Sequence, residues 1–325
     1  MIEASAPGKV VLWGEYAVLT GAPALVMAVD RYARCQLQAT ADVWEFAALG
    51  FAAPAARIAR QRLLAADPPP ADAVWRTVWQ ALRAVDGAHL PQGGQVCLDT
   101  RSFHHHGSKL GLGSSAAICV AAYGALCRLL GQQPSYTGAL AVHRQLQGGA
   151  GSGIDVAASW HGGTVKFLRG DATEPGPVSA WSLPAELHVT FIWTGRPAST
   201  VDHLARFRAW LERGQHAPLD ALSLASQRLF ETERLEAALK DYVAALQALD
   251  AAASLGIFSD AHVRLGRLAI EAGVVYKPCG AGGGDLGAAF TDDAAAAARF
   301  ARMASAQQFL PIPLEIASHG FQVTG

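Results

Sequence analysis

The chain has 325 residues and a net charge of −1, because 26 lysines and arginines nearly balance 27 aspartates and glutamates. A balanced charge gives no overall positive field, so we expect no nucleic-acid or membrane partner, and any phosphate must be bound locally. Alanine supplies much of the 51% hydrophobic fraction, and no bulky apolar run reaches the roughly 18 residues of a membrane span. The N-terminus does not resemble a signal peptide, so we expect a cytoplasmic protein.

The length is most simply explained by two domains with a cleft between them. The first half is expected to hold strands and helices in mixed order. Strands are predicted at 10–14, 24–29, 33–39, 95–99 and 164–168, and helices at 71–85, from Ser115 to about Gly131, and at 135–147. Prolines in 169–185 predict a boundary, which divides the chain into domains 1–175 and 186–325.

The second half is predicted to begin with a strand at 187–194 and to be mainly helical over 201–255 and 260–272. A strand in GAAF, a helix in DAAAAARFARMA and a closing strand in PLEIA (313–317) are predicted to follow. This order predicts an α+β fold in which helices cover a sheet.

Five cysteines form an odd count without CxxC pairs, which argues against a disulfide framework and a zinc site. Four of them have apolar sequence neighbours and are expected to be packing residues. Cys279 lies in the glycine-rich stretch KPCGAGGGDLGAAF (277–290), but no neighbouring histidine would activate its thiol. We therefore expect Cys279 to contribute its backbone.

Three glycine-rich segments are candidates for phosphoryl-transfer chemistry. In GLGSSAA (111–117), two glycines and two serines precede a buried helix, so backbone N–H groups and the helix N-terminus favour an anion. In APGKVVLWGEY (6–16), Lys9 is suited to neutralising phosphoryl oxygens. In GAGSGIDVA (149–157), Asp155 is suited to accepting a hydroxyl proton during phosphoryl transfer, although, for this segment taken alone, helix capping by Ser152 or Asp155 is the more common role.

The order of PGKVVLWGEY, KLGLGSSAA and CGAGGGDLG resembles the three signature motifs of the GHMP kinase family. The resemblance implies a two-domain α+β fold, ATP and Mg²⁺ as cofactors, and a small-molecule acceptor in the cleft. It also implies a monomer or a homodimer.

Positions that match the family motifs have implied roles. Lys9, Lys109 and Asp155 would be catalytic, with Asp155 orienting Lys9 and the acceptor. The ATP phosphates would be bound by Gly111, Leu112, Gly113, Ser114, Ser115 and Ala116, with Ser115 as a magnesium ligand. The acceptor would be bound by Lys9, Ser152, Arg196, Ser199, Gly280, Ala281 and Gly282.

Within the family, GEY after Lys9, Asp285 after the glycines and WTGRPAST (193–200) are most similar to members that act on 5-phosphomevalonate. Members that act on mevalonate carry a magnesium-binding glutamate about eleven residues before the aspartate, whereas this chain has His143 and Arg144 there. A kinase for mevalonate or another small molecule remains the alternative, and a related decarboxylase ranks third. A catalytically silent ATP-binding regulator is a further alternative.

Two other features of the sequence suggest different functions. The run His104–His106 precedes the phosphate loop, but adjacent histidines point in different directions, which favours a partly exposed lid over a metal site. A nicotinamide-dinucleotide protein is disfavoured because no GxGxxG follows the first strand with an acidic residue about twenty positions later.

Overall fold

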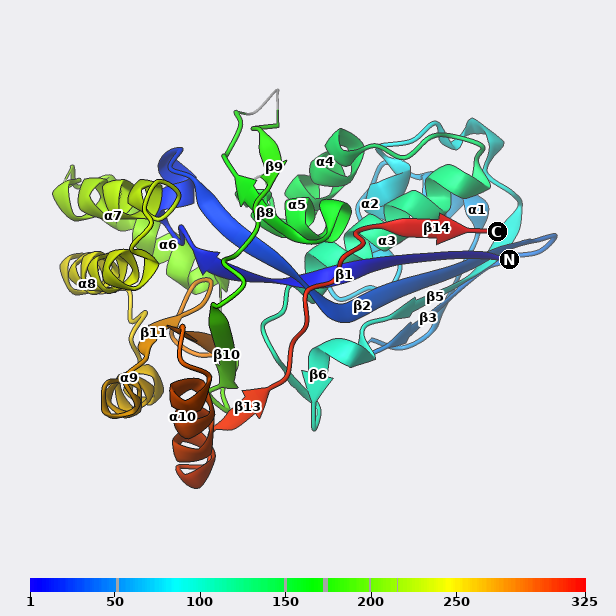
Figure 1. Cartoon of the computed structure of the whole chain (residues 1–325). Helices are drawn as coiled ribbons and strands as arrows, with labels where there is room; N and C mark the ends of the chain where they lie inside the picture. The colour runs from blue at the N-terminus through cyan, green and yellow to red at the C-terminus, as the bar shows by residue number, and fades with distance from the viewer. Residues whose placement is uncertain (51–52, 149–150, 172–174, 199, 215) are drawn as a thin grey trace.

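The computed structural model describes all residues except 51–52, 149–150, 172–174, 199 and 215. The larger of its sheets has eight strands, in the order β14-β1-β2-β5-β3-β4, with β8 pairing with β2 and with β9 (Figure 1). These strands are β1 (Ile2–Trp13), β2 (Ala24–Thr40), β3 (Trp44–Leu49), β4 (Ala56–Ile58), β5 (Gly93–Asp99), β8 (Thr164–Phe167), β9 (Val178–Ala180) and β14 (Gln322–Thr324).

The predicted strands at 24–29 and 33–39 form one long strand, β2, which pairs antiparallel with β1. In its second half, Ala33, Cys35 and Leu37 are buried, whereas Arg34 and Gln36 are exposed. This alternation is that of a strand with one face on a core and one in solvent. The sheet therefore has a covered face on which helices can pack.

Helix α3 (Ser114–Leu129) packs against β1 and β2 and is buried along most of its length, as its alanine-rich sequence predicts. Its neighbours in the same layer are α2 (Arg76–Leu82), α4 (Tyr136–Leu146) and α5 (Ile154–His161). The smaller elements of this half are α1 (Arg60–Leu64), the short hairpin β6 (His104–His105) and β7 (Ser108–Lys109), and the 3-10 turns η1 (Ala17–Thr20), η2 (Gly87–His89) and η3 (Arg101–Phe103). In the described part of the chain, no helix combines the length and apolarity needed to cross a membrane.

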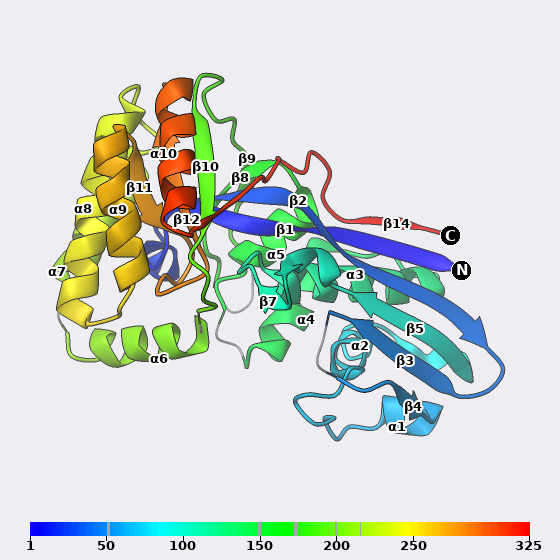
Figure 2. The ribbon, with the colours of Figure 1, turned by 90° about the horizontal axis from the view of Figure 1, so that it is seen from below.

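A second sheet of four strands has the order β11-β12-β10-β13 and carries its own layer of helices (Figure 2). Its strands are β10 (His188–Trp193), β11 (Val275–Pro278), β12 (Leu286–Thr291) and β13 (Leu310–Ile312). Its helices are α6 (Thr200–Leu211), α7 (Ala217–Arg228), α8 (Leu235–Ala253), α9 (Asp260–Ala272) and α10 (Ala294–Ala306). The predicted helical region 201–255 is thus three helices.

The end of the chain returns to the first sheet, where β14 pairs with β1. The predicted closing strand in PLEIA is wrong: β13 ends at Ile312, before Pro313, and only Ile316 forms an isolated bridge, with Val29. Pro311 lies within β13 and pairs with Ile192, whereas Pro313 directly follows the strand and has no N–H with which to continue the ladder. The division at 175 and 186 stays a prediction, but residues 322–324 belong to the larger sheet.

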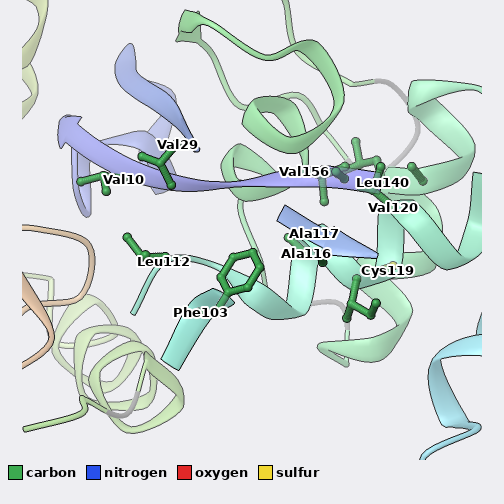
Figure 3. Packing of buried hydrophobic residues seen from close by; sticks show 14 of the residues in the cluster. Val10, Val29, Phe103, Leu112, Ala116, Ala117, Cys119, Val120, Leu140 and Val156 are labelled. Carbon is green, nitrogen blue, oxygen red and sulfur yellow. The ribbon is translucent and has the colours of Figure 1, made fainter. Parts of the chain in front are cut away.

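The glycine-rich segment 111–117, which we call the phosphate loop for its predicted role, is anchored in the core of the first half. Figure 3 shows Leu112 and Phe103 beside the first turns of α3, where Ala116 and Ala117 are also buried. Leu112 is 1% exposed although the glycines on either side of it are not buried. One apolar side chain therefore fixes a loop whose backbone remains accessible.

Candidate active site

The phosphate loop has the backbone conformation that its glycines predict. Gly111 and Gly113 have φ angles of +76° and +75°, in the region that favours glycine. Gly113 is the N-cap of α3, and Ser114 and Ser115 begin the helix. The first N–H groups of a buried 16-residue helix therefore adjoin a loop of bare backbone, which is a favourable place for an anion.

Lys9 lies against this loop. Its backbone N–H donates to the carbonyl of Leu112 at 2.8 Å, and a Cβ on Gly113 would lie only 2.9 Å from Lys9 Cε. Its Nζ is 3.3 Å from Oδ1 of Asp155, and the two side chains are 11% and 28% exposed. The first and second motifs thus meet, and the ammonium group of Lys9 lies between the phosphate loop and Asp155.

Asp155 is held by the start of α5. Ser152 Oγ accepts a hydrogen bond from the N–H of Ile154 at 3.3 Å, and Asp155 lies in the first turn of the helix. The buried hydroxyl of Ser159, one turn further along, donates to the carbonyl of Pro7 at 2.8 Å. This bond fixes α5 to the strand that carries Lys9, so the Lys9–Asp155 pair is built on two rigid elements.

The third motif folds over the second. A Cβ on Gly111 would lie 2.5 Å from Cβ and Cγ of Asp285, so only glycine fits there. Asp285 itself has a φ of +52°, and its Oδ1 accepts a hydrogen bond from the N–H of Ala198 at 3.2 Å. Burial raises the pKa of the Asp285 carboxyl, against the opposing effects of the Ala198 bond and of Lys9. Asp285 therefore joins the phosphate loop to the segment after β10.

Two histidines support the glycines of the third motif. His262 is buried, with Nε2 3.0 Å from the carbonyl of Gly284 and Nδ1 2.7 Å from the hydroxyl of Tyr276. Burial lowers the pKa of His262 to about 4, so its ring is neutral near pH 7. His203 lies within 2.7 Å of where a Cβ on Gly283 would be. These contacts fix the backbone of the loop.

A buried polar network links the first motif to the third. Glu15 Oε1 accepts from Lys277 Nζ at 2.5 Å and Oε2 accepts from Tyr242 Oη at 2.7 Å. The N–H of Gly280 lies 3.4 Å from the same Oε1. Tyr16, next to Glu15, donates its hydroxyl to the carbonyl of Ala281 at 2.6 Å. Glu15 and Tyr16 thus place the third motif opposite Lys9.

These elements enclose a pocket of about 130 Å³. Of the predicted site residues, Lys9, Ser152, Asp155, Gly280 and Ala281 line it. Its other lining residues are Val11, Glu15, Tyr16, Val18, Leu19, His143, Gln147, Gly151, Gly153, Ile154 and Leu204. Residues from positions 9 to 281 therefore meet in one cavity that combines an ammonium, two carboxylates and apolar walls.

Several predicted residues lie outside this pocket. Lys109 is exposed on β7, and Arg196 is exposed and offers its backbone carbonyl to the N–H of Asp285. Gly282 packs against Ile257. Ser199 lies outside the described residues. Ser115 is exposed at the start of α3 and lines a second pocket of about 360 Å³.

The second pocket was not anticipated from the sequence. Besides Ser115, it is lined by Ala53, Ala71, Asp72, Ala73, Val74, Arg76, Thr77 and Leu146. The PPP that precedes this segment in the sequence indicated only a helix start. No motif marks the pocket, because its shape comes from α2 and α3 packing together.

The remaining sequence candidates have structural roles here. Cys279 is buried and burial raises the pKa of its thiol to about 11, which does not suit a nucleophile. His104 and His105 lie on the β6 hairpin, with His104 Nδ1 3.0 Å from the carbonyl of Thr100. Among the described residues, no group of three or more His, Cys, Asp or Glu side chains is arranged to hold a metal ion.

Comparison with known proteins shows to which family the chain belongs. A family model described as GHMP kinases N terminal domain matches residues 76–163. Phosphomevalonate kinase from Streptomyces sp. (strain CL190) is 30% identical over 344 aligned residues, covering 88% of this chain and 89% of the relative. Mevalonate kinase from Thermococcus sibiricus is 31% identical over 248, covering 74% and 70%.

A solved structure of Streptococcus pneumoniae phosphomevalonate kinase, in complex with phosphomevalonate and AMPPNP, superposes with a TM-score of 0.76. It shares 19% sequence identity, and the match covers 97% of this chain and 100% of that one. At that identity the superposition supports the fold, and the α+β prediction is confirmed. The family model and the sequence relatives identify a small-molecule kinase. The chain belongs to the GHMP kinase family and is an enzyme of that family, a phosphotransferase that uses ATP.

Proposed function

We propose that this kinase transfers the γ-phosphoryl group of ATP to (R)-5-phosphomevalonate, giving 5-diphosphomevalonate for isoprenoid biosynthesis by the mevalonate pathway. The observation that carries the proposal is the pocket in which Lys9 and Asp155 lie between the phosphate loop and the third motif. A relative that is matched over 89% of its own length is named a phosphomevalonate kinase, which supports the same acceptor.

On the nucleotide side, the ATP phosphates would lie on the backbone from Gly111 to Ala116, at the positive end of the α3 dipole. Lys109 is exposed just before this loop and would reach phosphate oxygens. The pocket of about 360 Å³ beside Ser115 would take the base, since ligand pockets commonly start at roughly 300 Å³. The γ-phosphate would then point toward Lys9.

On the acceptor side, Ser152, Gly280 and Ala281 line the pocket and would bind the acceptor with Lys9. Arg196 and Ser199 belong to the segment after β10, next to Asp285, and we retain them as acceptor-binding candidates. Tyr16 and Glu15 also line the pocket, and they hold the backbone of the third motif.

The chemistry requires positioning and charge rather than strong base catalysis. A phosphate monoester is mostly a dianion near neutral pH, so its attacking oxygen needs little deprotonation. Lys9 would neutralise charge as the phosphoryl group passes from the leaving ADP to the acceptor in line. Asp155, 3.3 Å from Lys9 Nζ, would keep that ammonium group oriented.

Magnesium fits this site as an ion held mainly by phosphate oxygens and water, which Mg²⁺ commonly accepts. The described residues include no carboxylate and histidine cluster for it, but Ser115 presents an exposed hydroxyl at the phosphate loop. Ser115 is therefore the protein ligand that we propose. When bound, the ion would offset the negative charge of the ATP phosphates.

Phosphorylation of mevalonate is the second candidate, because mevalonate kinases match across most of this chain. The test measures the release of ADP from Mg-ATP when mevalonate, 5-phosphomevalonate, galactose and homoserine are offered separately. A Lys9→Met variant is the control. We expect turnover with 5-phosphomevalonate that the variant loses. Turnover with mevalonate alone would overturn the proposed acceptor, and no turnover with any acceptor would favour a silent ATP-binding regulator.

A further inference from the structure

One wall of the acceptor pocket carries a buried histidine that neither the motifs nor the mechanism above uses. His143 lies on α4 and is 2% exposed, and its imidazole lines the same pocket as Lys9 and Asp155. Its Nε2 is buried and has no hydrogen-bond partner among the residues that the structure describes. A buried polar atom without a hydrogen-bond partner destabilises a folded protein, so its presence beside a ligand pocket needs an explanation.

The fold directs this face of α4 to the pocket. His143 and Gln147 are four residues apart and therefore lie on one side of the helix, and both line the cavity. Leu140, one turn earlier, packs where a Cβ on Gly153 would be, at the start of α5. The helix is thus fixed against the loop that carries Asp155, and the imidazole is held at the pocket wall.

The electrostatic surroundings indicate which form of the ring is present. Burial lowers the pKa of His143, and the Lys9 ammonium lowers it further, while Asp155 opposes them. The ring is therefore neutral near pH 7 and has one N–H to donate. A neutral donor beside Lys9 and Asp155 suits an anion that arrives with the acceptor.

We propose that His143 is an acceptor-binding residue, whose Nε2–H donates a hydrogen bond to the phosphate that the acceptor already carries. The inference rests on the proposed function and deepens it, because it identifies a residue that selects a phosphorylated acceptor. A neutral imidazole can donate its N–H to a phosphate dianion at this position, whereas a carboxylate in its place would repel the dianion.

The test compares His143→Leu, which removes the donor, with His143→Gln, which keeps an N–H. Gln145→Leu, on the exposed side of the same helix, is the matched control. With 5-phosphomevalonate, His143→Leu is expected to raise the acceptor KM about 10- to 100-fold, as for a lost hydrogen bond to a charged group. The KM for ATP should stay within about twofold, His143→Gln should recover part of the loss, and Gln145→Leu should behave as the unmodified enzyme.

Thermal melting checks that each variant folds. A second measurement uses the unmodified enzyme, in which the histidines are labelled with ¹⁵N. In an NMR titration, 5-phosphomevalonate should shift the His143 imidazole signal and mevalonate should not.

An unchanged acceptor KM in folded His143→Leu, or no shift of the imidazole signal, would overturn the inference alone. If the unmodified enzyme does not turn over 5-phosphomevalonate, the proposed function fails and the inference fails with it.

Discussion

The ammonium group of Lys277 lies 2.5 Å from the carboxylate of Glu15, and the two side chains are 0% and 2% exposed. Lys277 lies two residues before the third motif, which begins at Cys279, and Glu15 belongs to the first motif. Tyr242 completes the network, because its hydroxyl donates to Glu15 and accepts from the N–H of Gly14 at 2.8 Å. The pair therefore fixes the relative position of two parts of the site that are 262 residues apart in sequence.

Removing Lys277 should destabilise the protein strongly. Lys277→Met would leave the Glu15 charge buried without its partner, and breaking a buried pair costs about 3–5 kcal/mol. Urea denaturation measures this, with Lys240→Met as control, because the Lys240–Glu236 pair is exposed and worth under about 1 kcal/mol. The double variant Glu15→Gln/Lys277→Met should lose less than the sum of its single changes. Equal midpoints for Lys277→Met and Lys240→Met would contradict this.

Asp155→Asn should lower kcat by roughly 10- to 100-fold with a phosphorylated acceptor. Asparagine keeps the shape of the side chain but removes the charge that orients Lys9, whereas an essential general base would contribute up to about 10⁴-fold. Steady-state kinetics with 5-phosphomevalonate measures the change, and circular dichroism checks the fold. A loss beyond about 10⁴-fold in folded protein would assign Asp155 the role of base.

Gly111→Ala should raise the KM for ATP, because the new methyl group would meet Asp285 and the φ of +76° is unfavourable to alanine. The φ angle alone costs about 1–2 kcal/mol. Gly131→Ala is the matched control, since Gly131 has a φ of +66° but no atom within 4 Å of the added Cβ. Adding Asp285→Gly to Gly111→Ala should restore part of the ATP affinity. The absence of any rescue would show that the clash with Asp285 is not the cause.

Stability should fall as the pH drops from about 6.5 toward 4. The pKa of His262 is about 4 in the folded protein against 6.5 as its ordinary value, so the unfolded chain binds more protons between these values. Complete protonation would remove up to about 3 kcal/mol. The free energy of unfolding, measured by urea at several pH values, checks this. His262→Gln should flatten the dependence only in part, because burial also lowers the pKa of His143.

The sequence by itself determined the motifs and the main helices, but it did not predict the short strands β4, β9 and β14. The apolar run after Ser115 predicts α3, and the glycines at 111 and 113 predict positive φ angles, because these properties depend on neighbouring residues. The family motifs likewise predict that Lys9, Asp155 and the phosphate loop belong to one site, and the structure brings these three together. The closing strand was misplaced because Pro313 ends the ladder, and the chain then crosses to the first sheet.

Only the tertiary structure decided which side chains face the site from outside the motifs. In the sequence, His143 has the pattern of an ordinary helix residue and Lys277 that of an exposed lysine. In the structure, both side chains are buried. Their roles depend on segments that are distant in sequence: α4 meets the loop before α5, and β11 meets the end of β1. Such contacts determine how far a group is removed from water and which partner it has, and a local sequence pattern contains neither. The desolvation and the partner together set the charge and the energy of a buried group.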